Sequence, residues 1–217
     1  MPAEAFVFDA YGTLYDVHSV AARCESCFPG KGAQLSQLWR AKQLEYTWQR
    51  SLMQRYAPFS TVTREALAYA CAALGLKLSV AQMEGLMSEY LGLALYPDVS
   101  TTMQSLRGKK TAILSNGSPD MLLPLVKNSG LKFDAVISVD EVKTYKPAPR
   151  VYELAVKRLD ADKRTIGFVS SNCWDALGAK SFGFSVYWIN RMNAPVDRLG
   201  FQPDVILNSL SDLPARA

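Results

Sequence analysis

Six short apolar runs, each followed by turn residues or polar side chains, constrain the fold of this chain more than any other feature. They are apolar at nearly every position and do not alternate with polar residues. This pattern is typical of strands that are covered on both faces, as in a parallel sheet. The runs are residues 5–8, 111–114, 135–139, 166–169, 185–189 and 204–207.

Helix signals lie between these runs. Residues 118–130 place Ser118 at an N-cap position, Pro119 at the first helical position and Gly130 at the end. Helical patterns also cover residues 148–160 and 174–183. Strand and helix therefore alternate over residues 96–217, which predicts an α/β fold with a Rossmann-like, doubly wound parallel sheet.

Residues 16–95 differ, because they contain almost no strand-like run. A long amphipathic helix is predicted over residues 33–56, and two more over 63–75 and 79–95. We therefore expect a helical-bundle cap domain of residues 16–95, inserted into a core domain of residues 1–15 and 96–217. The apolar positions at helical spacing in the long helix are Leu35, Leu38, Trp39, Tyr46 and Met53.

Composition and charge exclude several classes of function. The net charge is only +4 and no run of lysine or arginine is present, so neither nucleic acid nor an anionic membrane is an expected partner. Small anionic substrates remain compatible with this charge. No stretch has the length of a membrane span and the N-terminus lacks a leader pattern, so a cytoplasmic protein is expected.

The few histidines and cysteines exclude further chemistry. His18 is the only histidine, so a histidine-rich metal site is ruled out and a Ser-His-Asp or Cys-His mechanism would need this one residue. Cys24 and Cys27 form a single C-x-x-C in a polar, helical stretch, where ordinary reduced thiols are expected. The nucleophile and base of an enzyme of this composition are expected to be carboxylates or lysine.

Polar side chains follow the predicted strands at their carboxyl ends, where open parallel sheets bind their ligands. Taken alone, each has an ordinary alternative: a turn aspartate, a turn Ser-Asn-Gly, a surface lysine or a helix cap. Their coincidence at several strand ends favours a site. The residues are Asp9, Ser115, Asn116, Asp140, Lys146, Ser170, Ser171, Asn172 and Asp175.

These residue types form a consistent chemical set. Lys146 beside Asp9 would keep that carboxylate ionised by Coulomb attraction. An ionised carboxylate can act as a nucleophile and form an ester that water later cleaves. Ser115 and Asn116 would supply donors for an anionic substrate group, and Asp175 is a candidate for positioning or activating the water.

The chain resembles the haloacid dehalogenase superfamily in four segments that occur in the order of its motifs. They are FDAYGT, ILSNG, YKP and FVSSNCWD, and the helical block after the first strand is similar to the cap domain of that superfamily. The segments FDAYGTLYDVHSV, LWRAKQLEYTW, YKPAPRVYELA and WINR extend the resemblance to the L-2-haloacid dehalogenase family along the whole chain.

This resemblance implies roles for individual residues. Asp9 is the implied nucleophile, and Arg40 with Asn116 would draw off the halide. From the residues alone, Arg40 would be interpreted as a solvated helix residue with its stem on apolar neighbours. The other implied catalytic residues are Lys146, Asp175, Ser170, Asn172 and Thr13, and the other implied substrate-binding residues are Ala10, Tyr11, Leu44, Phe59, Ser115, Tyr152 and Trp174.

Tyr11 departs from the pattern of most of the superfamily. Phosphatases of the superfamily have D-x-D in the first motif, where the second aspartate protonates an alkoxide leaving group and acids of the fourth motif help hold Mg²⁺. Here the second aspartate is replaced by Tyr11, and the fourth motif keeps Asp175 as its acid. A halide leaves without a proton, so no cofactor and no metal are expected. Cys173, within the fourth motif, has no assigned role.

Three functions remain for comparison. The favoured one is metal-independent hydrolysis of (S)-2-haloalkanoates to (R)-2-hydroxyalkanoates, with a small halogenated carboxylate and a halide ion as ligands. A Mg²⁺-dependent phosphatase is the alternative, against which Tyr11 argues. A catalytically silent binding protein of the same fold would be expected to lack Asp9 or Lys146, and both are present. The resemblance also implies a homodimer.

Overall fold

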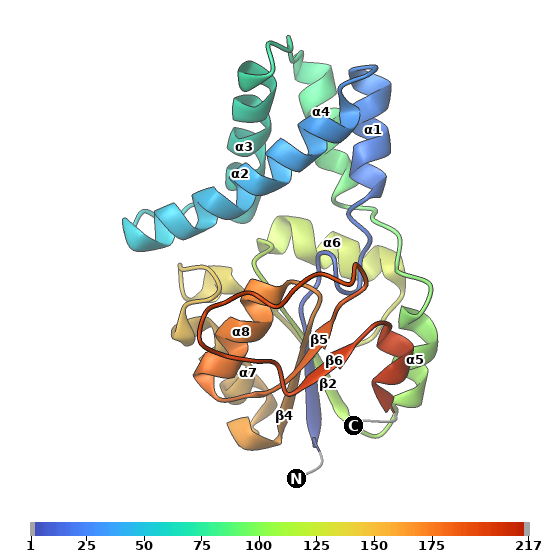
Figure 1. Cartoon of the computed structure of the whole chain (residues 1–217), viewed down its shortest axis with the longest axis vertical. Coiled ribbons are helices and arrows are strands. Elements are labelled where there is room, and N and C mark those ends of the chain that lie inside the picture. Colours follow the sequence, from blue (N-terminus) through green and yellow to red (C-terminus); the bar gives the residue numbers. More distant parts are fainter. Residues whose placement is uncertain (1–2, 215–217) are drawn as a thin grey trace.

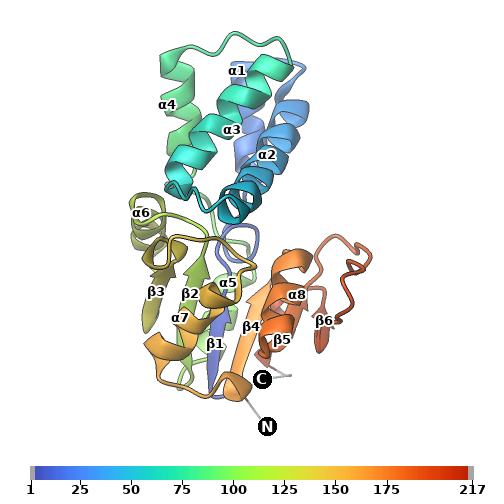
Figure 2. The ribbon, with the colours of Figure 1, turned by 90° about the vertical axis from the view of Figure 1, so that its left-hand side faces the viewer.

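The core of the protein is a six-stranded sheet in which every strand is parallel to its neighbours. The computed structural model describes residues 3–214. The strand order is β3-β2-β1-β4-β5-β6, as the view onto the sheet in Figure 2 shows. The strands are β1 (Ala5–Phe8), β2 (Lys110–Ser115), β3 (Ala135–Ser138), β4 (Ile166–Ser170), β5 (Ser185–Ile189) and β6 (Val205–Leu207).

Helices cover both faces of this sheet. Figure 1 shows α7 and α8 on one face and α5 on the other. All six predicted strands are confirmed to within one residue at each end, and so is the doubly wound α/β fold. The helices of this part are α5 (Val99–Ser105), α6 (Pro119–Ser129), α7 (Pro149–Leu159) and α8 (Cys173–Phe182), with short 3₁₀ turns at Val139–Glu141, Lys163–Thr165 and Leu210–Asp212.

Four helices between β1 and α5 form the cap region above the sheet (Figure 1). They are α1 (Ser19–Cys27), α2 (Gly32–Leu52), α3 (Phe59–Ala73) and α4 (Val80–Glu89). The long predicted helix ends earlier than expected, and Met53 lies beyond it with 61% of its surface exposed, so its assignment to the apolar face was wrong. Leu35 and Trp39 are buried as predicted.

The two chain segments that join the cap region to the core run side by side. Tyr15 and Leu95 form an antiparallel bridge, and the Asp16 N–H donates to the Ala94 carbonyl at 2.8 Å. The Tyr96 N–H donates to the Leu14 carbonyl at 3.0 Å. The connection therefore begins a few residues after the carboxyl end of β1.

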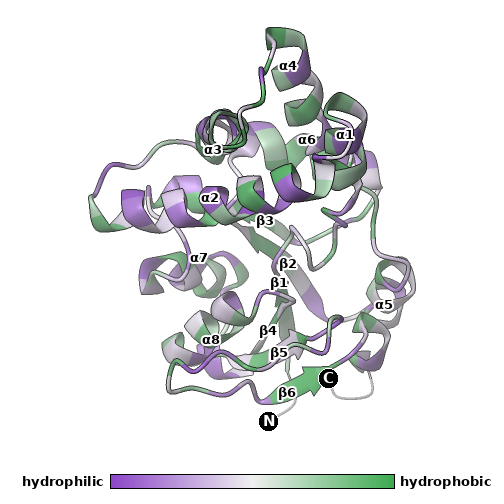
Figure 3. Ribbon diagram, turned by 45° about the horizontal axis from the view of Figure 1, so that its top comes forward, coloured by the Kyte–Doolittle hydropathy of each residue, from purple (hydrophilic) through white to green (hydrophobic). Residues whose placement is uncertain are grey.

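The buried core reflects the apolar runs of the sequence. The strands are largely hydrophobic, while α2 carries hydrophilic and hydrophobic stretches in turn (Figure 3). β1 is fully buried, and its neighbour β4 is buried along its whole length. None of the helices within residues 3–214 combines the length and the apolar character needed to cross a membrane.

One predicted helix cap has a different role. Ser118 is the N-cap residue of α6, but its hydroxyl makes no capping bond. It accepts a hydrogen bond from the Ser60 N–H at 3.1 Å, which joins the core to the start of α3. Gly130 ends α6 in the left-handed conformation, with φ of 70°, as predicted.

Candidate active site

Asp9 lies directly after β1, at the carboxyl end of the central part of the sheet. Its N–H donates to the Val169 carbonyl at 2.9 Å, which fixes the start of the loop. Three side chains donate to its carboxylate: Lys146 Nζ at 3.1 Å, Asn172 Nδ2 at 2.8 Å and Thr13 Oγ1 at 3.2 Å. These donors come from three separate segments, so the sheet topology brings them together and they fix the orientation of the Asp9 carboxylate.

Lys146 is buried and lies between two carboxylates. Its Nζ is 3.1 Å from Asp9 and 2.8 Å from Asp175. Burial alone lowers the pKa of Lys146, but the charges of Asp175 and Asp9 outweigh that effect and raise the pKa above its ordinary value. Lys146 therefore remains an ammonium ion that balances both acids.

Asp175 lies behind Lys146 and is fully buried in the first turn of α8. Tyr152 donates to its carboxylate at 2.8 Å and Ser170 at 3.1 Å, in addition to Lys146. Burial raises the pKa of Asp175 to about 6, with Lys146 opposing and Asp9 reinforcing that shift. With three donors, Asp175 is ionised at neutral pH and holds Lys146 in place.

A small cavity of about 10 Å³, partly open to solvent, lies above Asp9, between the sheet and the cap region. α2 and α3 of the cap contribute an arginine, a leucine and a phenylalanine, and the core contributes the remaining walls. Larger surface hollows lie elsewhere, but none of them is lined by Asp9. The lining residues are Asp9, Tyr11, Arg40, Leu44, Phe59, Asn116, Asn172 and Trp174.

Arg40 is the cation of this cavity. Its Nη1 donates to the Gln43 side-chain oxygen at 2.7 Å, and Gln43 in turn donates to Thr63 Oγ1 at 2.7 Å. Gln43 and Thr63 are buried, so the arginine is braced by a network inside the cap. An anion in the cavity would thus meet a fixed guanidinium group from the cap and Asn116 from the core.

Several predicted site residues are close to Asp9 without lining the cavity. Thr13 accepts from the Ser171 N–H at 2.8 Å while it donates to Asp9. Tyr152 and Ser170 donate to Asp175, and Ser170 Oγ also accepts from the Asn172 N–H at 3.1 Å. Ala10 and Ser115 are fully buried beneath the cavity, where Ser115 Oγ accepts from the Gly117 N–H at 3.0 Å.

Asp140 does not join this group. Its carboxylate accepts from the Tyr56 hydroxyl at 2.8 Å and pairs with Lys143, so the expected convergence of Asp140 on the site was wrong. The residue contacts the cap because the chain turns outward in the 3₁₀ turn Val139–Glu141.

A second contact between cap and core pairs the rings of Trp48 and Trp174, with centroids 5.6 Å apart.

Two groups that support the site were not predicted from the sequence. Gly178 packs so closely that an added methyl group would lie 2.5 Å from Pro147 Cβ and 2.6 Å from the Tyr152 hydroxyl. Arg191 pairs with Asp98 at 2.6 Å and donates from Nη2 to the Thr13 carbonyl at 3.3 Å. The only available signal for Arg191 was its place in the segment WINR.

Within residues 3–214, no group of three or more His, Cys, Asp or Glu side chains has an arrangement that would hold a metal ion. The cysteines are all free thiols. Cys24 is buried in α1 near Cys27, as expected for reduced cysteines in a helix. Cys173 Sγ accepts from the Asp197 N–H at 3.3 Å.

The fold and the aspartate-centred site define a hydrolase of a known family. The family described as haloacid dehalogenase-like hydrolase matches residues 3–183, and the chain belongs to it. An (S)-2-haloacid dehalogenase of Pseudomonas sp. (strain YL) is 49% identical over 95% of this chain and 91% of its own length.

Solved structures agree with this assignment. The crystal structure of the L-2-haloacid dehalogenase RSc1362 has a TM-score of 0.98 and 46% identity, and covers 100% of this chain and 99% of its own. The L-2-haloacid dehalogenase from Xanthobacter autotrophicus with chloropropionic acid covalently bound has a TM-score of 0.93 and 43% identity. The match covers 98% of this chain and 97% of that one.

Proposed function

We infer that the protein is an (S)-2-haloacid dehalogenase, which hydrolyses short L-2-haloalkanoates to D-2-hydroxyalkanoates and halide. The observation that carries this inference is the Asp9 carboxylate, which three donors hold at a small cavity that is also lined by the Arg40 guanidinium group. The similarity to (S)-2-haloacid dehalogenases along 95% of the chain supports the same activity.

In the first step an Asp9 oxygen attacks the carbon that bears the halogen, from the side opposite the carbon–halogen bond. The new carbon–oxygen bond forms as the halide leaves with its electron pair, so the carbon is inverted and an ester joins the substrate to Asp9. In the second step water attacks the ester carbonyl and releases the hydroxyacid. Asp9 is regenerated, and one proton is released for each turnover.

We assign Lys146, Asn172 and Thr13 to orienting Asp9, because each donates directly to its carboxylate. A fixed nucleophile can supply a large part of the rate enhancement. Asp175, with Ser170 and Tyr152 behind it, holds Lys146 and so acts on the nucleophile through it. No proton donor is needed at residue 11, since a halide is a very weak base.

We assign the two ends of the substrate to different donors. Arg40 and the side chain of Asn116 face the cavity and would take the departing halide, which carries a full negative charge once the bond has broken. Ser115 and backbone amides near Ala10, Tyr11 and Asn116 would hold the substrate carboxylate. Leu44, Phe59 and Trp174 supply apolar walls that exclude water from the reacting carbon.

We also propose that residues 16–95 form a separate cap domain on a core of residues 1–15 and 96–217. The side-by-side linkers at Tyr15 and Leu95 support this division, because they are the kind of connection at which one part can tilt on another. The position of the small cavity supports it too, because residues of the cap helices and of the core both line it.

A homodimer is the proposed assembly. The end of α2 exposes Trp48 and Leu52, Met53 follows it, and Leu52 is 85% and Met53 61% exposed. Exposed large apolar side chains are typical of contacts between subunits. Sedimentation velocity should give twice the mass of one chain, and Leu52→Asp should reduce it to one chain; a monomeric wild-type protein would contradict the proposal.

The activity is tested by incubating the protein separately with each enantiomer of 2-chloropropionate. We expect chloride release from the L enantiomer alone, with D-lactate as the product, and none from the Asp9→Ala variant. Release of phosphate from p-nitrophenyl phosphate with Mg²⁺, without chloride release, would contradict the proposal. L-lactate as the product would contradict attack with inversion.

A further inference from the structure

The hydroxyl of Tyr11 has no hydrogen-bond partner, although only 3% of the residue is exposed. Buried hydroxyl groups are nearly always paired, and one left unpaired destabilises the folded protein. Within the described part of the chain, two other buried side-chain atoms also lack a hydrogen-bond partner: Ser171 Oγ and Arg191 Nε. Of the three residues, only Tyr11 lines the cavity above Asp9.

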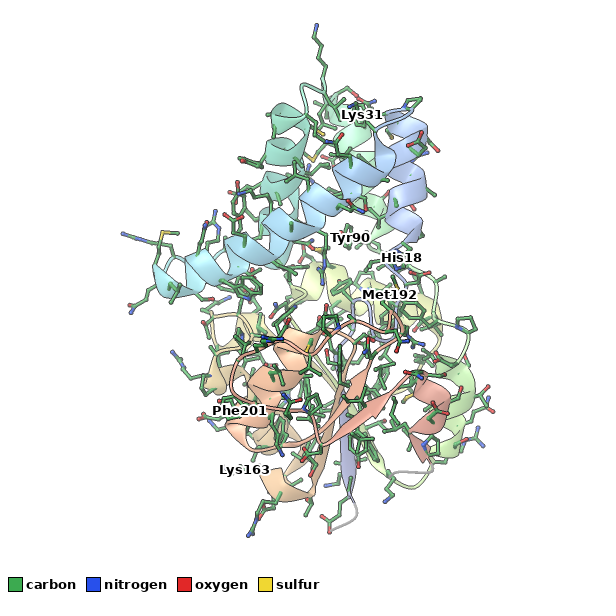
Figure 4. The ribbon with its side chains drawn as sticks, viewed as in Figure 1. His18, Lys31, Tyr90, Lys163, Met192 and Phe201 are labelled. Atoms are coloured by element: carbon green, nitrogen blue, oxygen red, sulfur yellow. The ribbon has the colours of Figure 1, made fainter. Side chains whose placement is uncertain are left out.

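The phenol ring is held firmly, so its hydroxyl has a defined position. The ring centroid lies 5.9 Å from that of Phe59 and 6.0 Å from that of Tyr90, which is at the base of the cap facing the core (Figure 4). On its other side the ring lies against Gly117, where an added methyl group would be 2.9 Å from Tyr11 Cε2 and 3.0 Å from its hydroxyl oxygen.

The same side of Gly117 also faces the hydroxyl of Ser115. The added methyl group would be 3.3 Å from Ser115 Oγ, so the oxygens of Tyr11 and Ser115 both approach one point beside the glycine. Ser115 Oγ already accepts from the Gly117 N–H, which leaves its own hydrogen free to donate. Asn116 uses its side-chain oxygen to accept from the Lys146 N–H at 3.0 Å, which leaves its amide nitrogen as a donor.

The Asn116 amide is assigned to the halide, so the hydroxyls of Tyr11 and Ser115 are the two unused donors that approach one point beside Gly117. A carboxylate is the group that matches converging donors. We propose that the Tyr11 hydroxyl donates a hydrogen bond to the carboxylate of the bound haloacid, next to Ser115. This inference rests on the proposed function of the site. It makes Tyr11 a specificity-determining residue for the charged end of the substrate.

Tyr11 is suited to this role because it remains a neutral donor. Burial raises the pKa of Tyr11 well above its ordinary value, and the neighbouring Tyr90 adds to the shift. The phenol therefore keeps its proton at neutral pH. Arg40, the cation of the cavity, lies on the cap and is left for the halide.

The test is the Tyr11→Phe variant, which removes one oxygen atom and leaves the ring. Its unliganded form should be as stable as the wild type or more stable, because an unpaired hydroxyl has been removed. Calorimetric titration should show that its dissociation constant for propionate rises at least about tenfold, as expected for the loss of a hydrogen bond to a charged group. Its affinity for bromide should not change.

Tyr15→Phe is the matched control. Tyr15 lies on the same loop and is buried, but its hydroxyl is 3.1 Å from Ser129 Oγ and so has a partner. This variant should lose stability in urea denaturation and should bind propionate as the wild type does.

Several results would overturn the proposal. One is a wild-type protein that does not bind propionate. The others concern Tyr11→Phe: an unchanged affinity for propionate, a loss of affinity for bromide alone, or a loss of stability without ligand equal to that of Tyr15→Phe. Failure of the proposed function would look different: propionate binding would depend on Tyr11, but the wild type would release no chloride from L-2-chloropropionate.

Discussion

The ammonium group of Lys146 lies 3.1 Å from the Asp9 carboxylate, and 1% of the lysine side chain and 9% of that of Asp9 are exposed. The same nitrogen is 2.8 Å from Asp175, so one cation balances two buried acids. Each acid also accepts hydrogen bonds from neutral side chains, which compensates part of the cost of burial. The nucleophile is therefore held in one place beside a cation.

Replacement of Lys146 by methionine should damage both stability and activity. The variant leaves Asp9 and Asp175 buried without their shared cation, and breaking a buried pair in this way costs about 3–5 kcal/mol of unfolding free energy. A misplaced nucleophile should lower kcat about a hundredfold. Both effects are measured by urea denaturation at pH 7.5 and by chloride release.

The stability loss in Lys146→Met should shrink at acid pH. Lys146 lowers the pKa of Asp175, so without the lysine this pKa rises further, Asp175 becomes neutral as the pH falls, and part of the uncompensated charge disappears. Lys157→Met is the control, because its side chain is 74% exposed and it lies 4.0 Å from Glu153. An equal loss of stability in the two variants would contradict the role given to Lys146.

The activity should decline at acid pH with a pKa near that of Asp175. Burial raises the pKa of Asp175 to about 6, so this group is ionised at neutral pH and becomes protonated below that value. The protonated form loses its charge interaction with Lys146, and kcat/KM should fall as the pH drops through about 6. The measurement is the pH profile of kcat/KM, which reports ionisations of the free enzyme.

Tyr152→Phe tests the origin of this acid limb. The hydrogen bond from Tyr152 lowers the pKa of Asp175, so its removal should move the limb to higher pH. At pH 8 the variant should recover more of the wild-type activity than it does at pH 6. If the acid side of the kcat/KM profile stays at the same pH in Tyr152→Phe, or moves to lower pH, Asp175 does not control the pH dependence of the activity.

Gly178→Ala should be destabilising, although alanine is the better helix former. The added methyl group would lie 2.5 Å from Pro147 Cβ and 2.6 Å from the Tyr152 hydroxyl, so the residues next to Lys146 and Asp175 must shift. We expect a loss of about 1–3 kcal/mol in thermal or chemical unfolding, together with lower kcat. Gly92→Ala is the control, because nothing lies within 4 Å of its added methyl group.

Asp98→Ala should weaken the loop that carries Thr13. Asp98 accepts from Arg191 at 2.6 and 3.0 Å, from Ser209 at 2.8 Å and from the Leu210 N–H at 2.8 Å, and Arg191 reaches the Thr13 carbonyl. Removal of hydrogen bonds to a charged group should cost at least about 2 kcal/mol of unfolding free energy. Equilibrium unfolding in urea measures this loss.

The contribution of Asp98 to the free energy of unfolding should depend on pH. Burial alone would raise the pKa of Asp98, but the bonds from Arg191, Ser209 and Leu210 outweigh it and lower the pKa. A lowered pKa means that the stabilisation is complete above the ordinary value and is lost as the pH falls through the lower folded value. The wild type and Asp98→Ala should thus differ less in strong acid than at pH 7; a constant difference would contradict this account.

The sequence predicted the sheet well because its signals are local. An apolar run such as residues 166–169 needs cover on both faces whatever its partners are, and the polar residues after it mark the carboxyl end of the strand. The meeting of Asp9, Lys146 and Asp175 also followed, since the carboxyl ends of parallel strands lie at one edge. The role of Arg40, by contrast, depended on the family resemblance.

Features that arise from contacts distant in the sequence could not be predicted. Gly178 resembles any glycine in a helix until the structure places Pro147 against it. Asp140 follows a strand as the other site residues do, yet the 3₁₀ turn directs it to Tyr56 of the cap. Tyr11 stood out as a replacement for an acid, but only the packed structure reveals that its hydroxyl lacks a partner.

The central claim, that Asp9 forms an ester which water then cleaves at the Asp9 carbonyl, is tested most directly by isotope transfer. The protein is incubated with L-2-chloropropionate in ¹⁸O-labelled water for many turnovers, and the peptide that contains Asp9 is then weighed. The account predicts that ¹⁸O enters the Asp9 carboxylate, and that in a single turnover with excess enzyme the lactate carries unlabelled oxygen. Turnover with label in the lactate alone, and none in Asp9, would mean that water attacks the substrate directly and would contradict the account.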